Sequence, residues 1–245
     1  MIHLLFSSFV MAADVNPEQD PHQWLEDVGG DKALDWVRGH NETTVNALTD
    51  FEEFKQTEAK LLSILESDDR IPFVNYQEGY LYNVWRDAEN PRGLWRRTTM
   101  ESYRTDEPEW DVLLDLDALG KAEEENWVWH GANCLPDSTL CLVSLSRGGA
   151  DADVVREFDL ETRTFVEGGF TLPEAKSSVS WVDRDHLLVG TDFGEGSLTD
   201  SGYSRIVKRW TRGTPLEEAE TLFEGTKENV WVYGCLLYTS PSPRD

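Results

Sequence analysis

The chain has 245 residues, of which 39% are apolar and 28% are charged, so it can form a packed core. This composition excludes disorder, a collagen helix and a coiled coil as descriptions of the whole chain. The 47 acidic residues outnumber the 22 basic residues and give a formal charge of -25. Because this charge repels phosphate backbones and anionic lipid, we expect neither nucleic acid nor a membrane as a partner.

Residues 1–13 hold a weak candidate signal peptide. A short apolar run over 4–11 is followed by Ala12 and Ala13, small residues typical of a cleavage site. No Lys or Arg precedes the run, so an apolar N-terminal strand or a misplaced start codon remains an alternative. The localisation therefore stays open between the cytoplasm and export. No stretch reaches the roughly 18 apolar residues that a membrane-spanning helix needs.

Residues 14–70 are predicted to form a helical N-terminal segment. Apolar residues recur at steps of three to four from Asp31 to Glu66, which predicts two helices. Gly39 and His40 are expected to interrupt the first of them, because glycine disfavours a helix interior.

From Ile71 onward the period shortens, and short runs rich in β-branched and aromatic residues alternate with turn residues. A short helix is expected within residues 119–125. The clearest predicted strands cover residues 80–85, 93–98, 110–116 and 140–145.

A weak internal repeat favours a β-propeller over residues 71–234. Residues 154–158 resemble residues 206–210, and residues 140–143 resemble residues 186–189, at a spacing of about 50 residues. About three blades fit into this length, fewer than the four or more of a closed propeller. Aromatic residues near the starts of the units are expected to fill the cores between blades; they are Trp127, Trp129, Trp181 and Trp231.

The sequence carries no local signature of a catalytic or cofactor site. A Gly-x-Ser-x-Gly turn is absent, and the glycines at 190, 194 and 196 do not lead from a strand into a helix. We therefore expect no cofactor, no metal ligand and no catalytic residue within the chain. The single histidines are expected to be structural; they are His22, His40, His130 and His186. The acidic pairs lack the spacing of a calcium loop and are expected in solvated turns; they are Asp68 and Asp69, Asp151 and Asp153, and Asp183 and Asp185.

Cys134 and Cys141 flank a turn-like stretch between two predicted strands. A disulfide across this hairpin is one interpretation, and it requires an oxidising compartment. Two buried free thiols are the other. No Cys or His spacing typical of a zinc site is present.

Residues 235–245 (CLLYTSPSPRD) differ in character from the acidic, tryptophan-containing pattern before them. Their back-translation is similar to a transposase adapter used in preparing sequencing libraries, in one continuous reading frame. We therefore expect the genuine coding sequence to end near Gly234, so that the chain is an N-terminal fragment with an adapter-derived tail.

Several segments resemble the prolyl oligopeptidase family of serine peptidases (peptidase family S9). Residues 20–27 (DPHQWLED) are similar to the family's opening, and residues 83–99 (NVWRDAENPRGLWRRTT) look like its first propeller strands. Residues 145–152 (LSRGGADA) and 193–203 (FGEGSLTDSGY) are similar to segments of one bacterial branch. Ser204 departs from that branch, which usually has proline there.

The resemblance implies a seven-bladed propeller that caps an α/β-hydrolase domain, with the helical segment packed on the hydrolase. It implies hydrolysis of short peptides through an acyl-enzyme, by default after proline, although a related branch cleaves after basic residues. The Ser, Asp and His of the family's triad follow the propeller, so none maps onto this chain, and the fragment is expected to be inactive. A stand-alone propeller that binds partners as a scaffold is the alternative.

Overall fold

A computed structural model describes residues 20–236 of the chain. Residues 1–19 and 237–245, which include the candidate signal peptide and most of the unusual tail, lie outside the described part. The described residues fall into two compact units that divide between Leu65 and Glu66, and each is described by itself. Within residues 20–236, no helix is long and apolar enough to cross a membrane.

The first unit is helical, as predicted. It contains the 3-10 helix η2 (Gln23–Glu26), α1 (Asp31–Leu48) and α2 (Glu52–Leu65). The predicted interruption at Gly39 and His40 is wrong, because α1 continues through both residues. Side chains bond to backbone oxygens there: Thr43 Oγ1 donates to the oxygen of Gly39 at 3.0 Å, and His40 Nδ1 lies 2.8 Å from the oxygen of Trp36. The hydrogen bonds of α1 thus outweigh the free-energy cost of a glycine in a helix interior.

Both helices leave most of their apolar side chains exposed, and Ala33 is the buried residue of α1. Large apolar residues at helical spacing remain uncovered; they include Val45, Leu48, Phe51, Leu61, Leu62 and Leu65. An amphipathic helix normally buries such a stripe against another element. This surface is therefore able to pack on a further domain.

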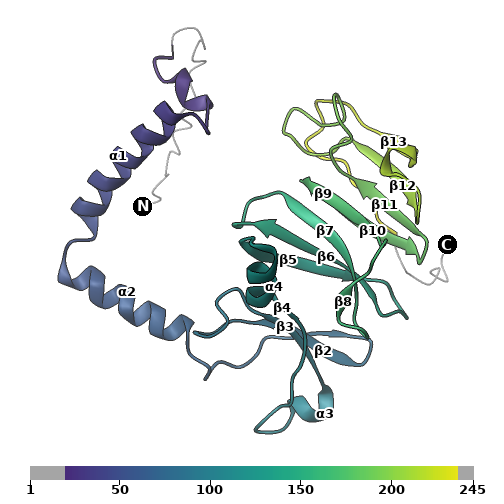
Figure 1. Cartoon of the computed structure of the whole chain (residues 1–245), viewed down its shortest axis with the longest axis horizontal. Coiled ribbons are helices and arrows are strands. Elements are labelled where there is room, and N and C mark those ends of the chain that lie inside the picture. Colours follow the sequence, from purple (N-terminus) through teal and green to yellow (C-terminus); the bar gives the residue numbers. More distant parts are fainter. Residues whose placement is uncertain (1–19, 237–245) are drawn as a thin grey trace, which may run out of the picture. The chain divides into compact units, whose positions relative to one another are not determined.

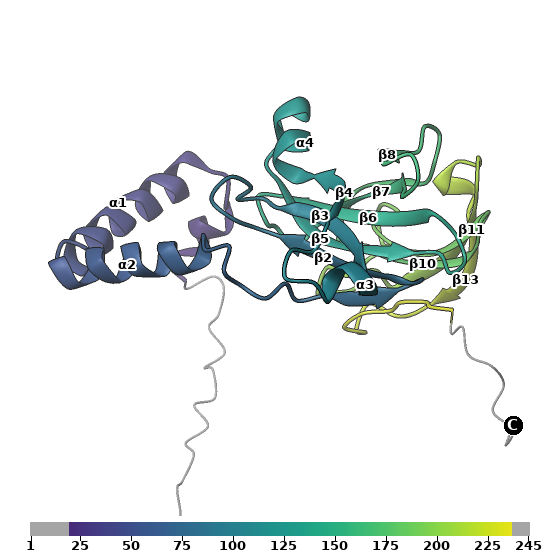
Figure 2. The same ribbon diagram turned by 90° about the horizontal axis from the view of Figure 1, so that it is seen from below.

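The second unit consists of three antiparallel sheets, shown one after another in Figure 1 and from another side in Figure 2. The first sheet has the order β1-β2-β3-β4, with bounds Asn75–Gln77, Tyr80–Trp85, Leu94–Thr99 and Asp111–Asp115. The second has the order β5-β6-β7-β8, and β9 also pairs with β7; the bounds are Trp127–Cys134, Leu140–Arg147, Asp153–Asp159, Thr164–Phe165 and Thr171–Ala175. The third has the order β10-β11-β12-β13, with bounds Ser178–Asp183, His186–Gly190, Ile206–Thr211 and Glu220–Glu224.

Short helices lie in the connections of the second unit. They are α3 (Met100–Tyr103), α4 (Leu116–Glu123) and the 3-10 helix η3 (Leu216–Glu218). The helix α4 joins the first sheet to the second and overlaps the helix predicted within residues 119–125. The Asp115 side chain accepts a hydrogen bond from the Ala118 N–H at 2.8 Å, which caps the start of α4.

Two apolar cores hold the sheets together. One lies between the first and second sheets and contains Trp95, Trp127 and Phe158. The other lies between the second and third sheets and contains Leu142 and Trp181. Packing of neighbouring sheets face to face is how propeller blades bury their apolar surfaces.

The predicted core role is confirmed for Trp127 and Trp181, and Trp129 packs partly buried against the first core. For Trp231 the prediction is wrong, because 47% of its surface is exposed. After β13 the chain runs along the third sheet, and the Val232 N–H donates to the Ser204 oxygen at 3.0 Å. The Trp231 ring therefore packs on Tyr233, 4.8 Å away between centroids, rather than between two sheets.

Candidate functional site

A Ser–His–Asp arrangement joins the first three strands of the second sheet. His130 lies on β5, Ser146 on β6 and Asp153 at the start of β7. The Ser146 Oγ and His130 Nε2 atoms are 3.1 Å apart, and His130 Nδ1 is 2.5 Å from Asp153 Oδ1. These are the groups and the order of contacts that serine hydrolases use.

This arrangement cannot act as a catalytic triad, because Ser146 is fully buried. A nucleophile must reach a substrate carbonyl, and no substrate atom can approach a hydroxyl without exposed surface. The network instead fixes three strands to one another. His130 bridges Ser146 and Asp153, and Asp153 is a partly buried partner of His130 rather than a solvated turn residue.

No pattern in the sequence predicted this network. His130 lies at a β-bulge between Trp129 and Gly131, where the register of β5 against β6 shifts. The shift brings the His130 ring toward Ser146, sixteen positions later in the chain. A bulge redirects a side chain without leaving a periodic signal.

The partly buried Asp153 is expected to make the free energy of unfolding depend on pH. Burial raises its pKa and outweighs the opposing charge and hydrogen bond of His130. The folded chain thus keeps a proton that the unfolded chain, with a pKa near 3.8, releases. The free energy of unfolding should therefore fall as pH rises from about 4 through the raised pKa, and Asp153→Asn should remove this loss in urea titrations between about pH 4 and 7.

Asp183 provides a control of opposite sign. The backbone N–H of Asp185, followed by the side chain of His186, lowers its pKa below 3.8. Its carboxylate stabilises the fold above pH 3.8, and this contribution disappears as pH falls through the lowered pKa. Asp183→Asn should therefore reduce stability at neutral pH. If the free energy of unfolding changed with pH at the same slope in both variants, the opposite pKa shifts of Asp153 and Asp183 would both be contradicted.

Three loops lie on the same rim of the second unit. In each antiparallel sheet, the loop from the second to the third strand lies at the end where the first strand begins. The short links between sheets join these same ends, so the loops 86–93, 148–152 and 191–205 share one rim, which we call the motif rim. These loops carry much of the sequence quoted above for the family resemblance. Because loops on a rigid scaffold commonly carry function, the motif rim is the candidate functional surface.

The first loop of the motif rim is fixed by its own side chains. Asp87 accepts hydrogen bonds from the Trp85 indole at 2.8 Å and from both the backbone and side chain of Asn90. Burial acts to raise the pKa of Asp87, but these hydrogen bonds outweigh it and lower the pKa. Gly93 closes the loop with a φ of +108°, and an added Cβ there would lie 2.9 Å from Val84 Cγ1. Only glycine fits this turn without strain.

The third loop is also internally bonded. The buried Ser197 hydroxyl lies 3.1 Å from Asp192 Oδ1 and accepts a hydrogen bond from the Phe193 N–H at 2.9 Å. Ser204, at the position where the bacterial branch usually has proline, is fully buried and donates to the Ile206 oxygen at 2.8 Å. The departure from proline is thus accommodated by a local hydrogen bond.

An open pocket lies where the chain enters the first sheet at the motif rim. Its polar side chains include Arg70 and Arg86, and its aromatic walls include Trp85 and Trp129. The Arg70 guanidinium lies 4.8 Å from the Trp85 ring centroid. Guanidinium groups and indole faces suit contacts with carbonyl or carboxylate oxygens of a neighbouring segment. None of the residues that line it was predicted as a site from the sequence.

The other sequence candidates do not form a site. His22 and His40 lie in the helical unit, and His186 pairs with Asp183 at 2.9 Å. No group of three His, Cys, Asp or Glu residues suited to a metal ion occurs within residues 20–236. Cys134 and Cys141 face each other across β5 and β6, and their Sγ atoms are joined in a disulfide.

Three successive antiparallel sheets packed face to face, with strands that pair in chain order except that β9 pairs with β7, define part of a β-propeller. Residues 10–241 match the family model of the prolyl oligopeptidase N-terminal β-propeller domain. The chain therefore belongs to the prolyl oligopeptidase family, and the resemblance seen in the sequence is confirmed.

Individual relatives agree with this assignment. An uncharacterized peptidase of Sinorhizobium fredii is 44% identical over 89% of this chain and 31% of its own length. The structure of a post-proline cleaving enzyme from Rickettsia typhi is 34% identical, with a TM-score of 0.83 over 91% of this chain and 33% of that one. Oligopeptidase B from Trypanosoma brucei, 20% identical with a TM-score of 0.58 over 84% of this chain and 28% of that one, shares the fold. The chain thus spans about a third of the length of these relatives.

Proposed function

We propose that this chain is the N-terminal part of a serine peptidase that hydrolyses short peptides after proline. The similarity to the post-proline cleaving enzyme, 34% identical across 91% of the chain, carries the proposal. Within the described residues, the one Ser–His–Asp arrangement has a fully buried serine. We expect the nucleophile, base and orienting acid to come from the two thirds of the relatives' length that this chain does not span, so that the chain alone is inactive.

The propeller acts as a cap that selects substrates by size. In the complete propeller, blades held to one another by apolar cores such as these two surround a fixed opening rather than an adaptable one. A short peptide can pass such an opening, whereas a folded protein cannot. The motif rim, where the chain enters the first sheet, faces the catalytic domain. The exposed apolar stripe of α1 and α2 packs on that domain.

The test begins with the source DNA. The reading frame is extended past the codon for Gly234, and the complete product is expressed and assayed with blocked peptide amides that end in proline or arginine. We expect a continuing frame with a Gly-x-Ser-x-Gly turn, and hydrolysis after proline at least about tenfold faster than after arginine. The 245-residue chain should show no hydrolysis.

Other outcomes would redirect the proposal. Preference for the arginine substrate would replace post-proline cleavage with cleavage after basic residues. Equal cleavage of a short peptide and of the same sequence inside a folded protein would contradict the size filter. A frame that closes the propeller and then stops would favour the stand-alone scaffold.

A further inference from the structure

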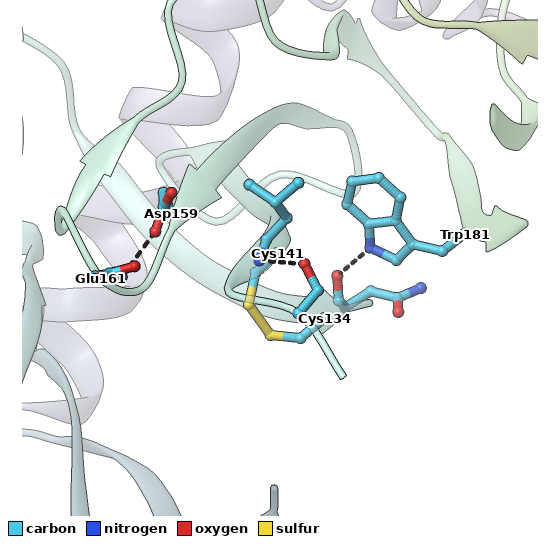
Figure 3. Close-up of a disulfide and its surroundings, with 8 residues drawn as sticks. Cys134, Cys141, Asp159, Glu161 and Trp181 are labelled. Atoms are coloured by element: carbon cyan, nitrogen blue, oxygen red, sulfur yellow. Dashed lines mark hydrogen bonds between the residues drawn. A yellow bond between two sulfur atoms is a disulfide. The ribbon is translucent and has the colours of Figure 1, made fainter. Parts of the chain in front are cut away.

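The disulfide between Cys134 and Cys141, drawn in Figure 3, joins the end of β5, an edge strand of the second sheet, to β6. Cys134 is the last residue of β5, and its partner in register on β6 is Cys141. The Leu135 N–H donates to the Leu140 oxygen at 2.9 Å and closes the hairpin just beyond the disulfide. The bond therefore holds the last residue of an edge strand, which pairs with one neighbour only.

The same strand end carries hydrogen bonds to the third sheet. The Trp181 indole N–H of β10 donates to the Asn133 oxygen at 2.8 Å, an interaction drawn in Figure 3. The Asn133 side-chain amide donates in return to the Val179 oxygen at 3.1 Å. Asn133 is directly followed by Cys134, so the disulfide anchors the backbone whose carbonyl Trp181 uses.

A bulge precedes this strand end, which pairs with β6 from Gly131 to Cys134. The pairing of β5 with β6 shifts register between Trp129 and Gly131, where Gly131 has a φ of +136°. A bulge disrupts the hydrogen-bond ladder locally. Beyond it, only the short stretch from Gly131 to Cys134 connects β5 to the contacts with the third sheet.

We propose that the Cys134–Cys141 disulfide is a redox-sensitive clamp that sets how firmly the second sheet is coupled to the third. The two sulfur atoms differ in access: Cys141 is fully buried, whereas Cys134 is partly exposed and lines an open pocket with Tyr82 and Trp129. A thiol reductant therefore reaches the Cys134 sulfur first.

The reaction is thiol–disulfide exchange with a dithiol. One thiolate of the reductant attacks the Cys134 sulfur, a mixed disulfide forms, and the Cys141 sulfur leaves and takes up a proton. The second thiol of the reductant then attacks the reductant's first sulfur, which is bonded to the Cys134 sulfur in the mixed disulfide. This step releases the Cys134 thiol. The protein gains two electrons and two protons, and the dithiol becomes a cyclic disulfide.

Hydrogen exchange measured by mass spectrometry tests the clamp on the full chain, oxidised or treated with dithiothreitol. Reduction should speed amide exchange about two- to tenfold in residues 131–134 and 178–181, as expected for weakening one or two hydrogen bonds. Exchange in β12 and β13 should stay unchanged. Cys134→Ser should show the faster exchange without reductant and should not respond to it.

Two further variants separate the clamp from other effects. Cys235→Ser removes the exposed free cysteine and should leave the redox response intact. Asn133→Ala keeps the disulfide but loses the hydrogen bond from the Asn133 side-chain amide to the Val179 oxygen. It should therefore speed exchange in residues 178–181 in the oxidised protein. If Cys134→Ser does not fold, the comparison of oxidised and reduced wild-type chain still decides. Unchanged exchange in residues 178–181 after reduction, or equal acceleration in all three sheets, would overturn the proposal.

Discussion

Arg212→Ala is expected to reduce the free energy of unfolding by about 3–5 kcal/mol, the cost of leaving a buried charge without its partner. The charge is that of Glu157 on β7, of which only 1% is exposed. Arg212, directly after β12, donates to both carboxylate oxygens of Glu157 at 2.9 Å. The pair therefore joins the second sheet to the third through a two-pronged ionic contact.

The surroundings of Glu157 leave no substitute for Arg212. The Phe170 N–H donates to Glu157 Oε2 at 2.8 Å, and the Arg212 guanidinium lies 4.5 Å from the Phe170 ring centroid. Truncation of Arg212 thus removes the positive charge and the ring contact together. One backbone hydrogen bond remains, which does not offset the desolvation of a full charge.

Urea unfolding of the variant and of a matched control measures the effect. Arg209→Ala removes an exposed arginine that pairs with Glu220 at 2.6 Å, and it should cost less than about 1 kcal/mol. Glu157→Gln combined with Arg212→Ala removes both charges and should be less destabilised than the sum of the single variants. A loss for Arg212→Ala no larger than for Arg209→Ala would show that the pair contributes little.

Trp95→Ala is expected to cost about 3–5 kcal/mol, the range for removing a large aromatic side chain from a core. Trp95 on β3 is 4% exposed and belongs to the core between the first and second sheets. Its ring centroid lies 5.0 Å from that of Trp129 and 5.6 Å from that of Phe158. The substitution leaves a cavity that these two rings, fixed on another sheet, cannot fill.

Trp231→Ala is the matched control for Trp95→Ala. It also removes an indole, but Trp231 is 47% exposed, so we expect a loss below about 1 kcal/mol. Thermal and urea unfolding of both variants against the wild-type chain measure the difference. A similar loss for the two tryptophans would mean that the contact between the first two sheets does not determine stability.

The large expected effects share a location. Glu157 with Arg212, and Trp95 with Phe158, each connect two neighbouring sheets. In architectures built from repeated units, the interfaces between neighbours supply much of the stability. Substitutions there should therefore weaken the second unit more than changes within one sheet.

Local patterns in the sequence were sufficient for the class of the fold and for many of its helices and strands. Periods of three to four residues identified both helices of the first unit, and alternating runs identified strands such as Tyr80–Trp85. The repeat of about 50 residues and the quoted motifs indicated propeller blades and the family. These features depend on local patterns, because the spacing of apolar residues reflects the geometry of a single helix or strand.

The contacts between elements could be found only in the tertiary structure. Glu157 and Arg212 lie in different blades, and no local pattern links a buried carboxylate to an arginine in the next unit. The Ser146–His130 contact likewise depends on a bulge in β5, which changes the direction of His130 without changing the pattern. Trp231 has the sequence character of a core tryptophan, yet it is exposed. The local sequence pattern around a residue determines whether it lies in a helix or a strand. Its burial and its partners depend on the element that packs against it.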